Sequence, residues 1–124
     1  MSTTPAPIGW FEIAASDTEK AEAFYGGIFG WSFQSDPNVP SYRIHDAGET
    51  GVSGGITTAV AGVPDTYAIF SVMVPDVAAA CGRVAELGGR VLVGPETVEG
   101  NGLVFANLED PDGNHFGVFT PPIG

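Results

Sequence analysis

The hydrophobic positions of this chain begin with a short apolar run and then change to a helical spacing. Residues 8–15 are almost entirely apolar, which predicts a buried β-strand. Ser16 and Glu19 carry the spacing of a capping box, in which two side chains satisfy free amides of the first helical turn. The helix that this predicts ends at Gly30, since glycine readily adopts the left-handed conformation found just past a helix. The aromatic-rich residues 24–31 are expected to be core and helix end rather than a cofactor site.

The same order of elements occurs a second time, 59 residues later. Asp17 aligns with Asp76 and Gly30 with Gly89, and Asp76 is expected to cap the second helix. Each helix is followed by three segments of extended pattern. These lie near 31–36, 40–47 and 52–60 in the first copy and near 90–98, 102–109 and 114–120 in the second.

The repeat predicts an α+β fold built from two βαβββ modules. The modules span about 8–60 and 67–120 and together form one domain over residues 1–124, with a concave mixed sheet. A repeated unit too small to bury its own apolar face must pack against its copy. A ligand site is therefore expected in the cup between the modules.

The charge of the chain is strongly negative. Fifteen acidic residues stand against four Lys and Arg, a formal net charge of −11 at pH 7. Such a field repels phosphate backbones and anionic lipids, so nucleic acids and membrane surfaces are not expected as partners. It would attract cations, although an acidic surface also serves solubility alone.

Cysteine content and leader patterns indicate a cytoplasmic protein. Cys81 is the only cysteine, which excludes an intramolecular disulfide, and its place in a helical apolar stripe predicts a buried thiol. Residues 1–7 lack a basic segment followed by an apolar run, so no secretory signal is predicted. No stretch approaches the ~20 apolar residues that span a bilayer.

Two motifs in this framework resemble the vicinal-oxygen-chelate superfamily, which contains glyoxalase I, extradiol dioxygenases and bleomycin-resistance proteins. Residues 21–31, Ala-Glu-Ala-Phe-Tyr-Gly-Gly-Ile-Phe-Gly-Trp, resemble the family's helix end, and Asp110-Pro-Asp-Gly-Asn114 resembles its late turn. The resemblance implies the fold over essentially the whole chain. It says little of activity, because these motifs pack helices and close hairpins, and fold does not fix function.

The resemblance also implies where a metal would be held in metal-using members. By position, the four ligand places are similar to Trp10, Thr58, Ile69 and Gly117. Imidazole and carboxylate are the groups that such metals prefer, and none of these four residues carries one. We therefore expect no metal and no other cofactor. A relocated site built from His45, Glu49 and His115 is an alternative, although their spacing does not demand it.

Strand alternation predicts the lining of the cup. If Trp10 faces it, Glu12 does too, whereas Phe11 and Ile13 face the helices. The lining is then mostly aromatic and aliphatic with a few polar groups, as is usual for a small-molecule pocket. The predicted ligand-binding residues are Trp10, Glu12, Ile56, Thr58, Ile69, Ser71, His115, Gly117 and Phe119.

Glu12 and His115 are the candidate acid–base residues. A carboxylate within an apolar strand is costly unless it is paired or hydrated, so Glu12 is a base, an anchor for a cation, or a satisfied structural group. His115 follows a turn, where a histidine at the rim is common, and His45 is expected on a solvated edge strand.

Two functions remain open from the sequence. The first is a metal-independent binding protein of bleomycin-resistance type, which sequesters an aromatic compound with or without a positive charge. The alternative is a glyoxalase- or dioxygenase-like enzyme, a lyase, isomerase or oxygenase, that uses Glu12 or His115 or relocated metal ligands. A homodimer is expected in both cases, because sheets of this size leave edges that pair across chains.

Overall fold

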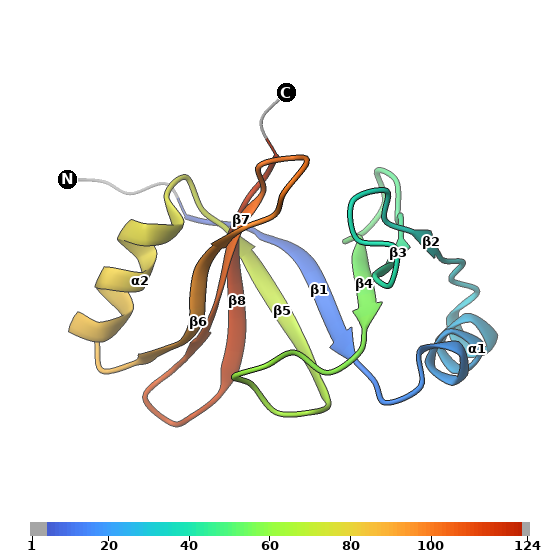
Figure 1. Ribbon diagram of the computed structural model, residues 1–124, viewed down its shortest axis with the longest axis horizontal. Helices are drawn as coiled ribbons and strands as arrows, with labels where there is room; N and C mark the ends of the chain where they lie inside the picture. The colour runs from blue at the N-terminus through green and yellow to red at the C-terminus, as the bar shows by residue number, and fades with distance from the viewer. Residues whose placement is uncertain (1–4, 123–124) are drawn as a thin grey trace. The chain divides into compact units, whose positions relative to one another are not determined.

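The computed structural model describes residues 5–122 and contains two helices and eight strands in this range (Figure 1). Residues 1–4, part of the segment expected to lack a signal, and residues 123–124 lie outside the described residues. The chain forms two compact units. We name them the α1 unit, Trp10–Ile69, and the α2 unit, Met1–Gly9 with Phe70–Gly124.

The βαβββ order occurs twice, as the sequence predicts. The first copy is β1 (Ile8–Ala14), α1 (Thr18–Phe29), β2 (Gln34–Ser35), β3 (Arg43–His45) and β4 (Gly54–Thr57). The second copy is β5 (Tyr67–Met73), α2 (Val77–Glu86), β6 (Arg90–Thr97), β7 (Val104–Glu109) and β8 (His115–Thr120). In both copies the first strand runs parallel to the last, and the remaining neighbours are antiparallel. The α+β class is therefore confirmed.

Both helices begin at equivalent aspartates. The Asp17 carboxylate accepts from the Lys20 amide at 3.1 Å, and the Asp76 carboxylate accepts from the Ala79 amide at the same distance. The cap predicted at Ser16 is therefore wrong by one residue. The repeat carried the better signal, because Asp17 is the residue that aligns with Asp76. Gly30 ends α1 in the left-handed conformation with φ 75°, as expected.

Strands β2 to β4 are shorter than the sequence pattern predicts. The Asp36 carboxylate accepts from the amides of Asn38 and Val39, and Asp46 accepts from the amide of Gly48. Such local bonds offer the backbone an alternative to sheet pairing. They convert much of the extended pattern at 31–36 and 40–47 into turns.

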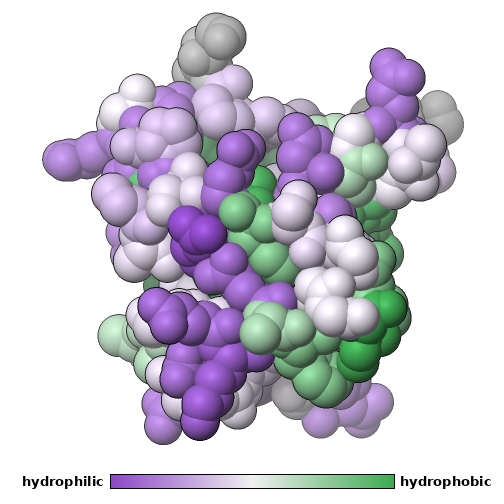
Figure 2. Space-filling model, turned by 90° about the vertical axis from the view of Figure 1, so that its right-hand side faces the viewer, coloured by the Kyte–Doolittle hydropathy of each residue, from purple (hydrophilic) through white to green (hydrophobic). Residues whose placement is uncertain are grey.

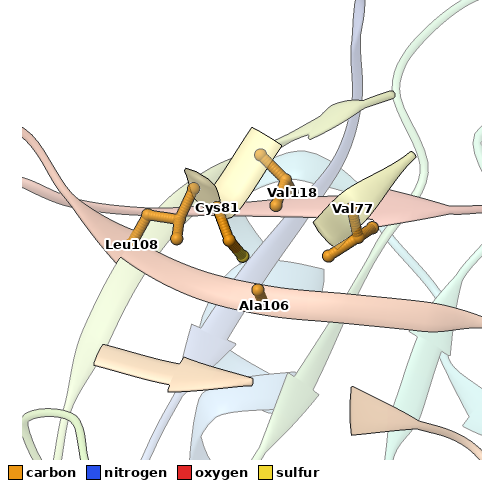
Figure 3. Close-up of a cluster of buried hydrophobic side chains, with 5 residues drawn as sticks. All are labelled: Val77, Cys81, Ala106, Leu108 and Val118. Carbon is orange, nitrogen blue, oxygen red and sulfur yellow. The ribbon is translucent and has the colours of Figure 1, made fainter. Parts of the chain in front are cut away.

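The α2 unit has an aliphatic core. Val77 and Cys81 of α2 pack on Ala106 and Leu108 of β7 and on Val118 of β8 (Figure 3). All five residues are at most 8% exposed, and Leu108 is fully buried. Cys81 is thus the buried thiol that its helical spacing predicts.

Helix α1 packs differently, through aromatic rings. Trp31 stacks on Tyr25 and His45 and lies 5.1 Å from the ring centre of Phe11. No residue of α1 is buried. Phe24, Ile28 and Phe29 are more than half exposed, so the expectation that all of 24–31 is core is wrong for these three. Figure 2 views the side on which α1 lies in Figure 1 and shows hydrophobic surface beside strongly hydrophilic side chains. No helix among residues 5–122 is long and apolar enough to cross a membrane.

Candidate functional site

Four side chains of the α1 unit, with Glu12 at their centre, form a hydrogen-bonded cluster. The Tyr42 hydroxyl donates to one oxygen of the Glu12 carboxylate at 2.7 Å, and the Tyr67 hydroxyl donates to the other at 2.5 Å. The indole N–H of Trp10 donates to the Tyr42 hydroxyl oxygen at 2.9 Å. The Trp10 and Tyr42 rings are also stacked, with centres 6.5 Å apart. We call these four residues the Glu12 cluster.

Strand geometry explains why these residues meet. Trp10 and Glu12 are two residues apart on β1 and share one face, whereas Phe11 points to the other face and contacts Trp31. Gly55 of β4 lies in register with Glu12. A side chain at Gly55 would overlap the Tyr42 ring, so glycine leaves the space in which this ring lies.

The cluster is partly shielded from water, and its phenols stay protonated. Burial raises the pKa of Tyr42 well above its ordinary value, and the negative charge of Glu12 raises it further. The pKa of Tyr67 is raised for the same two reasons in the same order. Both hydroxyls therefore act as donors to the carboxylate across the physiological pH range.

The other face of this sheet carries an ion pair beside an open hollow. Arg43 lies in register with Ile56, and its guanidinium contacts Glu22 of α1 through two hydrogen bonds of 3.0 and 3.1 Å. The hollow has a volume of about 540 Å³ and is lined by polar side chains of α1, β2 and β3 and by Thr58.

Two predicted pocket residues are therefore misplaced. Ile56 is fully buried and lies in register with Ile13, on the face opposite Glu12. Thr58 follows the end of β4 and lines the hollow beside Arg43. The sequence prediction assumed that the 59-residue offset between the copies also holds for the last strand of each copy. The register shows that Gly55 is the equivalent of Gly117, since these residues lie opposite Glu12 and Ser71 respectively.

At the last strand, the offset between the copies is three residues longer than at the first strand. Because three is an odd number, the two faces of the sheet are exchanged. Gly55 and Gly117 are 62 positions apart, whereas the first strands and helices are 59 apart. Because side chains alternate along a strand, a shift of three residues moves every side chain to the opposite face. On β4, the structural equivalent of Gly117 is therefore Gly55 rather than Thr58.

In the α2 unit, the alternation predicted for β5 and β8 agrees with the register. Ser71 lies opposite Gly117 and Met73 opposite Phe119. A side chain at Gly117 would overlap the Ser71 hydroxyl. Ile69 belongs to the α1 unit, where it is half-buried and shares its face of β5 with Tyr67.

His115 contacts a buried amide. Its Nε2 lies 2.7 Å from Oδ1 of Asn107, which is 4% exposed and lies in register with Gly117. His45 lies on the Trp31 ring and is half-buried, which corrects its assignment to a solvated edge. Within residues 5–122, no group of three or more His, Cys, Asp and Glu side chains could hold a metal ion. His45, Glu49 and His115 therefore do not form the alternative metal site.

Sequence reasoning missed Tyr42, Tyr67 and Asn107. Asn107 could have been found, because it interrupts the apolar run from Val104 to Leu108 in β7. The two tyrosines were visible as residue types, but their partner is 30 and 55 positions away. Only the tertiary fold brings them to Glu12.

The comparisons with known proteins agree on the family. The model of the Glyoxalase/Bleomycin resistance protein/Dioxygenase superfamily matches residues 7–118, and the chain belongs to this superfamily. Among solved structures, a superfamily member from Vibrio splendidus has a TM-score of 0.62 at 14% identity, covering 94% of this chain and 99% of that one. Methylmalonyl-CoA epimerase from Mycobacterium tuberculosis has the same TM-score at 13% identity, covering 93% of this chain and 87% of that one. These likenesses concern the fold alone.

Curated relatives differ in length. A glyoxylase-like domain-containing protein of Didymella fabae is 29% identical, and the match covers 93% of this chain and 94% of that protein. The putative glyoxylase CFP32 of Mycobacterium bovis is 31% identical over 90% of this chain and 43% of its own length. The anthracycline biosynthesis protein DnrV of Streptomyces peucetius is 27% identical over 93% of this chain and 47% of its own length. The chain thus spans less than half of the last two proteins.

Proposed function

We propose that this protein binds a small aromatic molecule without a metal ion, in the manner of a bleomycin-resistance protein. The Glu12 cluster is the observation that carries the proposal. It combines stacked Trp10 and Tyr42 rings with a carboxylate held by two hydroxyls, and ring faces with a few fixed polar groups are what a small-molecule site requires.

The chemistry of the four family ligand positions supports binding without a metal. Trp10, Ile69 and Gly117, at three of the four places that the family resemblance implies, offer no imidazole or carboxylate. Thr58 at the fourth place offers neither, and Gly55, which lies in register with Glu12, has no side chain. These residues do not fit a divalent ion that needs several nitrogen or oxygen ligands. The name of DnrV, a protein of anthracycline biosynthesis, agrees with a polycyclic aromatic ligand.

The experiment is a thermal-shift screen of planar aromatic natural products, followed by NMR of the Trp10 indole N–H. A Trp31→Phe variant leaves Trp10 as the only tryptophan and assigns its resonance. We expect at least one compound to shift this resonance and, at 100 times its Kd, to stabilise the protein by about 2.7 kcal/mol. A screen without hits, or hits that leave Trp10 unchanged, would contradict the proposal.

Catalysis is the second candidate, and the same contacts favour it. Two phenols hold the Glu12 carboxylate in one orientation, as a group that transfers protons needs to be held. His115 is held similarly by Asn107. Each hit of the screen should be incubated with the protein and followed by NMR. Turnover that Glu12→Gln or His115→Gln abolishes while binding persists would establish an enzyme.

The expected partners remain predictions. We propose a homodimer and a small-molecule ligand, with neither nucleic acid nor membrane as partner. Light scattering during size-exclusion chromatography measures the mass of the assembly directly, for comparison with the 12.8 kDa of one chain.

A further inference from the structure

Every hydrogen-bond donor of the Glu12 cluster points inward. An indole and a phenol have one donor each, and these are committed. The Trp10 N–H is donated to Tyr42, and both phenol O–H groups are donated to Glu12. What Trp10, Glu12 and Tyr42 can still offer a ligand is acceptor positions and ring faces.

We infer that the ligand of the Glu12 cluster is an organic cation, an aromatic compound that carries a protonated aliphatic amine, rather than a neutral or acidic one. This rests on the proposed function and adds the charge class of the ligand. An ionised carboxylate has about four acceptor positions, of which the two phenols occupy two. The remaining positions accept an ammonium N–H, and the negative faces of Trp10 and Tyr42 attract a cation.

The same inventory disfavours anions and neutral acceptors. A carboxylate or phosphate approaching the cluster would meet the like charge of Glu12 and find no free donor among these side chains. A neutral carbonyl would likewise leave its oxygen without a partner, which is costly in a partly buried site. The net charge of −11 adds a long-range preference of the same sign.

Tyr42 and Tyr67 thus determine the specificity through Glu12. Their raised pKa values keep both protons on oxygen, so that the hydroxyls continue to donate. Gly55 positions Tyr42, because any larger residue would occupy the space of its ring. The sequence predicted no role in ligand binding for Tyr42, Tyr67 or Gly55, and this arrangement gives each of them one.

The test uses three probes that share one aromatic body: naphthylmethylammonium, naphthylmethanol and naphthoate at neutral pH. Titration in the Trp31→Phe background, followed by the Trp10 indole resonance, gives a Kd for each. We expect the ammonium to bind roughly tenfold tighter than the alcohol, and naphthoate weakest. Equal binding of the alcohol or the naphthoate would overturn the inference while leaving aromatic binding intact. If none of the three shifts Trp10, the proposed function fails as well.

Two variants separate the local contact from the overall charge. Glu12→Gln and the control Glu99→Gln, an exposed residue of the α2 unit, change the net charge equally. We expect the ammonium preference to vanish in E12Q and to persist in E99Q. Equal loss in both would assign the preference to the long-range field and contradict the inference. The order of the three probes in the unmodified cluster stands as a test even if E12Q fails to fold.

Discussion

The two units share one topology but are stabilised by different kinds of interior. The α2 unit buries Val77 and Cys81 of its helix against β7 and β8, in a core without polar groups among its five buried members. The α1 unit buries no residue of its helix and instead has aromatic packing on one face of its sheet and the Glu12 cluster on the other. The comparison shows that the same order of strands can be stabilised either by an aliphatic core or by aromatic and polar packing. The polar contacts also differ: the α1 unit has the four-residue Glu12 cluster, and the α2 unit has the pair of His115 and the buried Asn107.

The largest expected effect comes from opening the aliphatic core. Leu108→Ala should lower the free energy of unfolding by about 2–5 kcal/mol, because Leu108 is fully buried and its removal leaves a cavity. Urea unfolding followed by circular dichroism measures the change. Leu87→Ala is the matched control, since Leu87 is 62% exposed. Equal losses in the two variants would show that the core is not where the structure puts it.

Two equivalent glycines provide the next comparison. Gly55→Ala should cost about 1–3 kcal/mol, because its methyl group overlaps the Tyr42 ring, and should shift the Trp10 indole resonance. Gly117→Ala should cost less, because it meets a small Ser71 hydroxyl that can rotate. Gly27→Ala in α1 meets nothing within 4 Å and should stabilise by roughly 0.5–1 kcal/mol. A Trp10 resonance that Gly55→Ala leaves unmoved would argue against the cluster.

Removing one donor from the cluster should have a smaller effect. Tyr67→Phe takes one hydrogen bond from the Glu12 carboxylate and should cost about 1–2 kcal/mol of unfolding free energy. Tyr25→Phe is the control, since Tyr25 stacks on Trp31 and makes no contact with the cluster. If the two variants lose the same free energy, the Tyr67 hydroxyl contributes nothing specific.

The smallest effect concerns the buried thiol of the α2 unit. Burial raises the pKa of Cys81, so folding favours the protonated thiol. The corresponding stability is present below the unfolded pKa of about 8.5 and is lost as pH rises through the folded value. Unfolding free energies measured from neutral pH upward should fall more steeply for the native chain than for Cys81→Ala. If the unfolding free energies of the two proteins change with pH in parallel, the pKa of Cys81 is not raised by folding.

The sequence predicts the fold well because local signals and the repeat agree. Asp17 and Asp76 begin equivalent helices, Gly30 ends one of them, and β6 to β8 lie within two residues of their expected bounds. The misplaced residues have a single cause. An extrapolated offset carried Ile56 and Thr58 to the wrong positions, because alternation converts a three-residue error into the opposite face.

The candidate site could be predicted only in part. Trp10 and Glu12 follow from alternation along one strand, since Phe11 between them contacts Trp31. Tyr42 and Tyr67 could not be assigned, because a hydroxyl at the end of a long side chain is placed by the turns that precede β3 and β5. A shared cup that includes Ser71, His115 and Phe119 stays a prediction.

The glycine opposite Glu12 also limits which side chains this position can accept. An aspartate or glutamate introduced at Gly55 would first have to evict Tyr42, and one at Gly117 would have to displace Ser71. A carboxylate side chain at either glycine would thus need a second substitution, at Tyr42 or at Ser71, before it could be accommodated.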